Sequence, residues 1–371
     1  MFPFNQPGPT AFYLTLYLAT FVLHLLPMAY VLAGAAVLLV RTLAGAKPAD
    51  DQLVEQFRQW LPFVLSVAIT AGVAPLLFLQ ILYSREFYTA NLLLFHRWMA
   101  ILPVLIVGFY LLYLVKGNWL WQRPLVVRAP AVAMVLACFV FIGWSWSENH
   151  LLSTASQAVW IEHYAAGRLN HFPAELWPRM GVWLGGVFPV MAAIVAWPLA
   201  RGEENSGTAR QLALFAAAGL VVGLASIGWY LRVLDAPSRI AALSAPFRAW
   251  QVALIAGIGL QIAAWILVWR SDRLLPLPRW LALVGAVLAV TGVAVCREAI
   301  RTSRLDMAAL LPRHQAAADV GGFWLFAAFL VLNTAAIAGC VYLVARNARP
   351  DDNDQERGVS EAVADGRAGR L

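Results

Sequence analysis

Charged residues are scarce in this chain. Of its 371 residues, 13% are charged and 61% are hydrophobic, whereas a soluble domain carries about 25% charged residues. Lysine is nearly missing, because the 27 basic residues include lysine only at positions 47 and 116. Such a composition excludes an ordinary soluble domain and is typical of a polytopic membrane protein.

Cysteine is scarce as well. Cys138, Cys296 and Cys340 lie in or at the ends of apolar stretches, without CxxC or CxxCH spacing. This spacing excludes a disulfide framework and the attachment motif of c-type haem, and it gives no iron–sulfur pattern. We expect these cysteines to be small packing residues, because free cysteine is among the most buried residue types.

Acidic residues are missing from the centres of all the apolar stretches. Glu148 and Glu298 stand at the ends of two such stretches. Proton-coupled transporters and pumps usually carry Asp, Glu or His within their helices as relays. The absence therefore argues against a proton-driven carrier and against an enzyme that needs a chain of buried carboxylates.

Long apolar segments dominate what is present. A helix needs roughly 20 apolar residues to cross the hydrocarbon core, and nine segments qualify: 11–41, 57–83, 91–115, 128–147, 177–200, 211–233, 247–269, 279–297 and 321–345. Ten-residue segments of alternating polarity, which would indicate a membrane barrel, do not occur. The sequence predicts an all-α membrane bundle of about nine helices over 1–347, followed by a polar, disordered tail at 348–371.

Basic residues collect at the ends of the predicted helices and give a net charge of +7. They form no compact soluble face, so nucleic acid is not an expected partner, and the lipid bilayer is. Sixteen of the 27 fall on the side of loops 42–56, 116–127, 201–210 and 270–278 and the tail, which leaves eleven on the other side. The positive-inside rule then predicts an outside N-terminus and a cytoplasmic C-terminus.

One long connection, 150–176, joins the fourth and fifth predicted helices. Its front half has apolar residues near helical spacing, which predicts a helix lying on the surface. It also carries His150, His163 and His171, at intervals that match no standard pattern of metal ligands. We expect solvated histidines at the membrane interface.

His24 is the single titratable group deep within a predicted helix. An ionisable residue at that depth is a functional-site hypothesis by default. Pro27, three residues on, predicts a kink that opens space at the preceding turn, and Met28 follows on the same face. The residues leave two interpretations: a haem ligand, or a packed histidine that donates its N–H to a carbonyl or to Gln80.

Several stretches resemble one membrane family. ITAGVAPLLFLQILYSREFYTA (69–90), FVFIGWSWSENHLL (139–152) and VAVCREAIRTSRL (293–305) are similar to helix ends in subunit I of cytochrome bd-type quinol oxidases. Nine predicted helices with a histidine in the first also match that family. The resemblance implies a subunit of the bacterial inner membrane that binds b-type haem or quinol, with His24 ligating the haem iron.

Other parts of the family pattern are missing. WPRMGVWLGG (177–186) offers no histidine where relatives place a second haem ligand, and 96–116 contains no glutamate. The quinol-binding loop is reduced to 234–246. Because oxygen reduction consumes protons, we expect a subunit that oxidises quinol or passes electrons to a partner, such as a cytochrome c or other subunits, without reducing oxygen.

The candidate cofactor residues are His24, Met28, His96, Met180 and Arg297, with His24 as the metal ligand. The methionines and His96 are included because thioethers and imidazoles both ligate haem iron. Two alternatives to the electron-transfer hypothesis stay open. In the first alternative the chain is a haem-free structural subunit of a larger membrane complex. In the second it is a transporter of a neutral or lipidic molecule.

Overall fold

The computed structural model describes residues 6–200 and 206–320, together with 324, 328–329, 331–332, 335–336, 338–339 and 342. The chain divides into two compact units, 1–314 and 315–371, and the first of them forms the helical bundle. The predicted ninth helix (321–345) and the predicted tail (348–371) fall mostly or wholly outside the described residues.

The described part of the chain is all α-helical, as predicted, and it contains no strand. The elements are α1 (Gly8–Leu43), α2 (Gln52–Leu82), α3 (Ser84–Leu93), α4 (Phe95–Lys116), α5 (Asn118–Trp121), α6 (Leu125–Ser153), α7 (Gln157–Ala165), α8 (Leu176–Leu199), α9 (Ser206–Val233), α10 (Ala236–Leu243), the 3-10 turn η1 (Ala245–Phe247), α11 (Arg248–Ser271), α12 (Pro276–Arg304) and α13 (Met307–Asp319).

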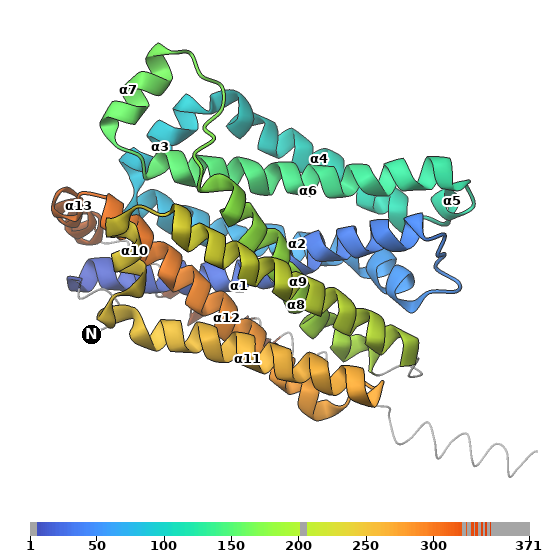
Figure 1. Cartoon of the computed structure of the whole chain (residues 1–371). Coiled ribbons are helices and arrows are strands. Elements are labelled where there is room, and N and C mark those ends of the chain that lie inside the picture. The colour runs from blue at the N-terminus through green and yellow to red at the C-terminus, as the bar shows by residue number, and fades with distance from the viewer. Residues whose placement is uncertain are drawn as a thin grey trace, which may run out of the picture. The chain divides into compact units, whose positions relative to one another are not determined.

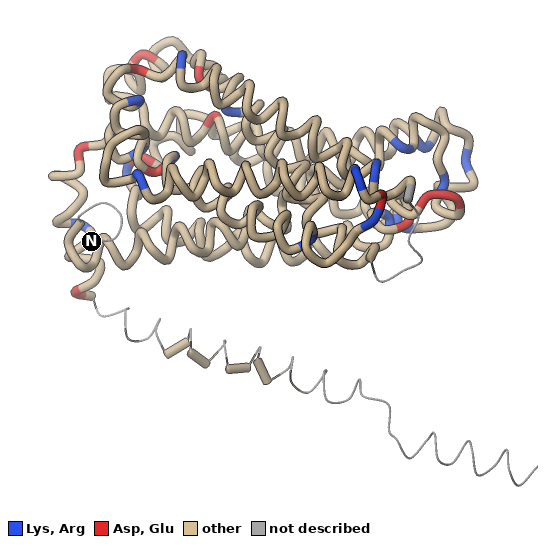
Figure 2. Tube along the Cα trace, turned by 60° about the horizontal axis from the view of Figure 1, so that its bottom comes forward, with Lys and Arg blue, Asp and Glu red and all other residues tan. Residues whose placement is uncertain are grey.

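Eight of these helices in the described residues are long and apolar enough to cross a membrane. They are α1, α2, α4, α6, α8, α9, α11 and α12. Charged residues lie mostly near the two ends of the bundle, and few lie in its middle (Figure 2). This distribution matches a bundle whose middle faces hydrocarbon, so the protein is embedded in a membrane.

The bundle has two ends, which we name the α7 end and the α5 end. The α7 end is where α1 begins and where α2, α6, α9 and α12 end, and the α5 end lies opposite (Figure 1). α1 has 36 residues, about 54 Å at 1.5 Å per residue. Because a hydrocarbon core is about 30 Å thick, such helices extend into the headgroup regions.

α1 occupies the centre of the first unit and packs against α2, α6, α8 and α12. The largest apolar core fills the half of the bundle toward the α5 end, where α1 contributes Ala33, Val37 and Leu38 and α2 contributes Phe57 and Leu61. The van der Waals contacts between these side chains hold the helices together within the membrane. The half toward the α7 end has a different interior, which contains many polar side chains.

Glycines allow two pairs of helices to approach closely. A Cβ on Gly185 of α8 would lie 2.5 Å from the backbone nitrogen of Gly223 in α9, and one on Gly257 of α11 would lie 2.5 Å from the nitrogen of Ala289 in α12. Small residues at such contacts let two backbones meet, which is how membrane helices associate without a hydrophobic driving force. These two contacts fix α8 on α9 and α11 on α12.

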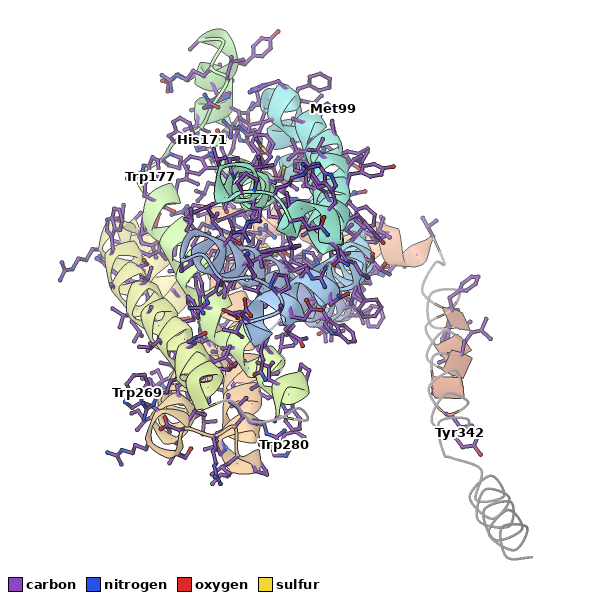
Figure 3. The ribbon with its side chains drawn as sticks, turned by 90° about the vertical axis from the view of Figure 1, so that its right-hand side faces the viewer. Met99, His171, Trp177, Trp269, Trp280 and Tyr342 are labelled. Atoms are coloured by element: carbon purple, nitrogen blue, oxygen red, sulfur yellow. The ribbon has the colours of Figure 1, made fainter. Side chains whose placement is uncertain are left out.

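Aromatic residues mark the α5 end of the last two spans. Trp269 and Trp280 are 47% and 55% exposed and lie on the outside of the bundle (Figure 3). The guanidinium of Arg210 lies 5.7 Å from the Trp269 ring centroid, and that of Arg279 lies 4.9 Å from the ring of Trp197. Tryptophan and arginine together are typical of the membrane–water boundary.

The segment after α6 contains the predicted surface helix, which is α7. The prediction of solvated histidines was wrong for two of the three residues, because His150 is 8% exposed and His163 is 2% exposed. α6 continues to Ser153, and His150 lies on its inward-facing side. α7 packs on α3, and its residue His163 is buried. His171 is half-buried.

Candidate functional site

His24 lies in a notch between α1 and α2. A Cβ on Gly72 would lie 2.9 Å from Cε1 of His24, so the notch exists because position 72 has no side chain. The imidazole Nδ1 lies 2.9 Å from the carbonyl oxygen of Ala68, one turn earlier in α2. Of the two hydrogen-bond partners that the sequence suggested, the carbonyl is confirmed, and Gln80 instead accepts from the hydroxyl of Tyr88.

This hydrogen bond fixes the tautomer of His24. A carbonyl oxygen only accepts, so Nδ1 carries the proton and Nε2 keeps its lone pair. The hydrogen bonds of the described residues include one to Nδ1 and none to Nε2, and the side chain is half-buried. Histidines that bind a metal usually donate their other ring N–H to a carbonyl or carboxylate in this way.

Arg297 of α12 reaches α1 one turn from His24. Its guanidinium lies 4.2 Å from the ring centroid of Phe21 and donates to the hydroxyl of Tyr17. Its Nε is buried without a partner in the described residues. Arg297 therefore contacts α1 at Tyr17 and Phe21, which stand seven and three residues before His24, and the described residues show no contact between Arg297 and the imidazole.

The other candidates lie apart from this pair. Met28 is half-buried one turn further along α1, and His96 is exposed at the start of α4. Met180 is 4% exposed in α8, where it packs in a small apolar cluster with Leu151 and Leu176. The structure records no contact that would join any of the three to the imidazole of His24.

A buried ion pair forms the polar interior of the α7 end. Glu298 and Arg301 of α12 are 0% and 3% exposed, and Arg301 lies 3.3 Å from the Glu298 carboxylate. Tyr83, which follows α2, donates its hydroxyl to Glu298 over 2.6 Å. Burial, followed by the adjacent carboxylate, raises the pKa of Tyr83 well above its usual value. The phenol is therefore protonated and able to donate, and the carboxylate has three partners, because Arg297 also lies 3.6 Å from it.

Arg179 and His150 adjoin this ion pair from α8 and α6. The charged groups acting most strongly on His150 are the guanidinium groups of Arg179, Arg301 and Arg297, in that order. His150 is 8% exposed, and neither of its ring nitrogens has a hydrogen-bond partner in the described residues. The guanidinium of Arg179 also lacks a hydrogen bond there, and Tyr230 and Glu175 are its nearest groups of opposite charge or partial charge.

A second set of ionic contacts ties α12 to the outer elements of the α7 end. Arg304 lies 2.7 Å from Glu175 before α8 and 3.4 Å from Asp235 before α10. Burial opposes ionisation of Asp235, but hydrogen bonds from Ser238 and the charge of Arg304 lower its pKa below the usual value. Arg304 is thus paired twice, unlike Arg179.

The loop between α7 and α8 is anchored by Glu148, which is 0% exposed in α6 and lies 3.0 Å from Nε of Arg97. The same carboxylate accepts from the backbone N–H of His171, and Arg97 also donates to Asn170. Beside this anchor, Trp144 makes an edge-to-face contact with Trp177, with ring centroids 5.0 Å apart. Figure 3 shows Trp177 and His171 on the same flank of the bundle.

Sequence reasoning missed the gathering of Tyr83, His150, Arg179 and Arg301. One signal was available, because Arg297, Arg301 and Arg304 recur at intervals of four and three around Glu298. This spacing places the three guanidinium groups on one side of a helix. Tyr83, His150 and Arg179 reach this place because of how the helices pack, which the local sequence does not indicate.

No protein-family model matches the sequence, and no curated protein matches it either. Among the described residues, no group of three or more His, Cys, Asp or Glu side chains is placed to hold a metal ion. A haem iron needs fewer protein ligands than such a group provides, since one histidine suffices in several haem proteins.

Proposed function

We propose that this protein is a haem-binding membrane subunit of a bacterial respiratory electron-transfer complex, similar in plan to subunit I of cytochrome bd-type oxidases. It oxidises quinol or receives electrons and passes them to a partner subunit or a cytochrome c, and it does not reduce oxygen. The observation that carries the proposal is the geometry of His24. Its ring is oriented by the Ala68 carbonyl and the Gly72 notch, with the Nε2 lone pair uncommitted.

His24 and Arg297 are the residues that would hold one b-type haem. His24 would hold the iron through Nε2. Arg297, whose guanidinium lies over Phe21 and whose Nε has no partner in the described residues, would supply positive charge for carboxylates of the haem. A bound haem supplies a one-electron redox centre. The protein's contribution is to fix the imidazole through the Ala68 carbonyl and to place it between two apolar helices, α1 and α2.

The lack of oxygen chemistry follows from proton supply. Oxygen reduction needs protons delivered along buried acidic groups. The part of α4 that crosses the membrane carries no Asp or Glu. Glu148 and Glu298 are each held by an arginine near the α7 end. Both carboxylates lie near one end of the bundle, so they do not form a path of acidic groups across it.

A haem-free structural subunit is the second candidate function. It is favoured by the close contacts of α8 with α9 and of α11 with α12, in which backbones meet at Gly185 and Gly257. In that case the hydrogen bond of His24 to Ala68 serves only to join α1 to α2. The same contacts disfavour the transporter hypothesis, because alternating access moves packed helices against one another.

Absorption spectroscopy of the purified full-length protein tests the proposal. We expect a b-type band in the reduced-minus-oxidised spectrum, with a ferrous spectrum typical of high-spin, five-coordinate haem. His24→Ala should remove the band, and His24→Gln, which retains a donor for the Ala68 carbonyl, should remove it as well.

His171→Ala is the matched control, because His171 is half-buried at the α7 end and its side chain makes no hydrogen bond in the described residues. This variant should keep the band. A wild-type protein that is folded, co-purifies with other subunits and shows no haem band would overturn the proposal in favour of the structural subunit.

A further inference from the structure

The charge balance inside the α7 end is uneven. Four arginines act electrostatically on His150, namely Arg179, Arg297, Arg301 and Arg304. Arg301 is paired with Glu298, and Arg304 is paired with Glu175 and Asp235. Arg297 is 3.6 Å from the already shared Glu298 carboxylate, and Arg179 has no ion pair in the described residues. Positive charge is thus in excess where water is scarce, and an uncompensated buried charge is costly.

Unused hydrogen-bond donors accompany this excess charge. A guanidinium has five N–H donors, and that of Arg179 makes no hydrogen bond within the described residues. His150 is more than nine-tenths buried, with Nδ1 and Nε2 both unpaired, and Arg179 is the charge that acts on it most strongly. Buried polar groups are normally hydrogen-bonded. His150 is the exception here, and Arg179 is half-buried. Their neighbours Leu151 and Met180 pack in one cluster, so an unpaired imidazole of α6 and a guanidinium of α8 lie close together and indicate a site for a ligand.

The level of these groups in the bundle suggests where the ligand comes from. His150 and Arg301 stand three residues before the ends of α6 and α12, and Arg179 stands three residues after the start of α8. At 1.5 Å per residue, all three lie about 4.5 Å inside the α7 end. Trp177, two residues before Arg179, is exposed and makes an edge-to-face contact with Trp144 of α6. Tryptophan at helix ends is typical of headgroup level, where phosphate groups are found.

We infer that Arg179 and His150 form a binding site for a phosphate-class oxyanion at the α7 end, with Arg297 and Arg301 adding positive charge. A phosphate offers more acceptor oxygens than a carboxylate, which suits the five donors of Arg179 and the N–H of His150. The oxyanion belongs either to an anionic phospholipid headgroup or to free phosphate. The two binding groups, Arg179 and His150, are not part of the proposed haem site, which shares with this site only the charge of Arg297.

The experiment measures the apparent melting temperature of the purified full-length protein by its tryptophan fluorescence. One arm adds inorganic phosphate against chloride at constant ionic strength, and the other adds phosphatidylglycerol to the detergent micelles. A ligand that binds the folded state raises the melting temperature with its concentration. We expect wild type to be stabilised in at least one arm, and the arm identifies the source of the oxyanion.

Arg179→Gln and His150→Asn should weaken the response. Loss of one charged hydrogen-bond partner should raise the half-saturating concentration about tenfold or more. Arg239→Gln is the matched control, because Arg239 is exposed at the same end and the substitution removes the same charge. Arg179→Lys keeps the charge and serves as the second variant in case Arg179→Gln does not fold.

The outcomes separate this site from the haem proposal. His24→Ala should leave the phosphate or lipid response unchanged, and Arg179→Gln should leave a haem band unchanged. The inference is overturned if neither phosphate nor phosphatidylglycerol stabilises wild type. It is also overturned if Arg179→Lys, Arg179→Gln and Arg239→Gln all respond as wild type does.

Discussion

At the scale of single residues, the orientation of His24 depends on the missing side chain at Gly72. Gly72 leaves room for the imidazole, and Gly72→Ala would place a Cβ 2.9 Å from Cε1 and 3.0 Å from Nδ1 of His24. The ring must then shift, and its hydrogen bond to the Ala68 carbonyl is lost. Loss of one hydrogen bond lowers the free energy of unfolding by about 0.5–1.5 kcal/mol. Replacement of a helical glycine by alanine raises it by about 0.5–1 kcal/mol.

We therefore predict that Gly72→Ala changes the melting temperature little but alters the haem band, because it moves the proposed ligand. Absorption spectra and thermal unfolding of the same sample provide the check. Gly228→Ala is the control, since a Cβ there meets nothing within 4 Å, and its spectrum should match that of wild type. A Gly72→Ala protein with full haem content and an unchanged band would speak against His24 as the ligand.

His171 gives a prediction about pH. Burial, with the nearby His163 and Arg168, lowers the pKa of His171 to about 4. The unfolded chain binds this proton near pH 6.5, so between about pH 6.5 and 4 it holds more protons at this site than the folded protein does. Stability should then fall as the pH falls through this window.

The measurement is the melting temperature between pH 4 and pH 8. We expect His171→Gln to flatten the slope below pH 6.5, because glutamine does not titrate. His96→Gln supplies the comparison, since His96 is exposed, and its slope should remain that of wild type. A slope that is equally steep in His171→Gln would assign the pH dependence to other groups, such as His163, whose pKa burial also lowers.

At the scale of helices, α8 and α9 lie close together because their backbones are in direct contact at glycines. Gly185→Ala would bring a Cβ within 2.5 Å of the Gly223 nitrogen and 2.8 Å of the Gly219 oxygen, neither of which can rotate away. The helices must separate, and overpacking of this kind costs about 1–3 kcal/mol. We predict a clear loss of thermal stability in Gly185→Ala.

The adjacent residue provides the control. A Cβ on Gly186 meets nothing within 4 Å, so Gly186→Ala should match or slightly exceed wild type in melting temperature. Thermal unfolding in one detergent and at one protein concentration compares the three proteins. Equal stability of Gly185→Ala and wild type would show that the two helices do not depend on this close approach.

Hydropathy predicted the helices of the described region better than it predicted their ends. The segment 128–147 corresponds to α6, which runs from Leu125 to Ser153. A hydropathy window stops where charged residues begin, but helical hydrogen bonds need no apolar side chains and continue into the headgroup region. The extra turns carry His150, which explains why its burial was not predicted.

The candidate site was predicted in part for a related reason. The depth of His24 and the class of its hydrogen-bond partner follow from its place in an apolar helix, where a polar group must be satisfied. The identity of that partner, Ala68, depends on how α1 and α2 pack. The pairing of Arg301 with Glu298 is local to α12, whereas Arg179 and His150 come from two other helices, and a single sequence does not place helices side by side.

At the scale of the whole chain, the distribution of charge bears on membrane orientation. The sequence count of basic residues was sixteen against eleven. Four of the eleven are the arginines around His150, which lie in helical turns of α8 and α12. The positive-inside rule applies to charges in loops near the helix ends. The same condition sets aside basic residues in the helical turns of the α5 end, such as Arg58 and Arg128, so the prediction rests on the original count of sixteen against eleven.

This difference predicts that the α5 end faces the cytoplasm and the α7 end faces outward. In a background with all three cysteines replaced by alanine, Lys47→Cys marks the α5 end and Glu162→Cys marks the α7 end. Lys47 is exposed between α1 and α2, and the Glu162 side chain in α7 is 63% exposed. A membrane-impermeant maleimide should label Glu162→Cys in spheroplasts and Lys47→Cys only after lysis. The reverse pattern would place the Arg179 and His150 site on the cytoplasmic side, where the same headgroup chemistry would reach it from the inner leaflet.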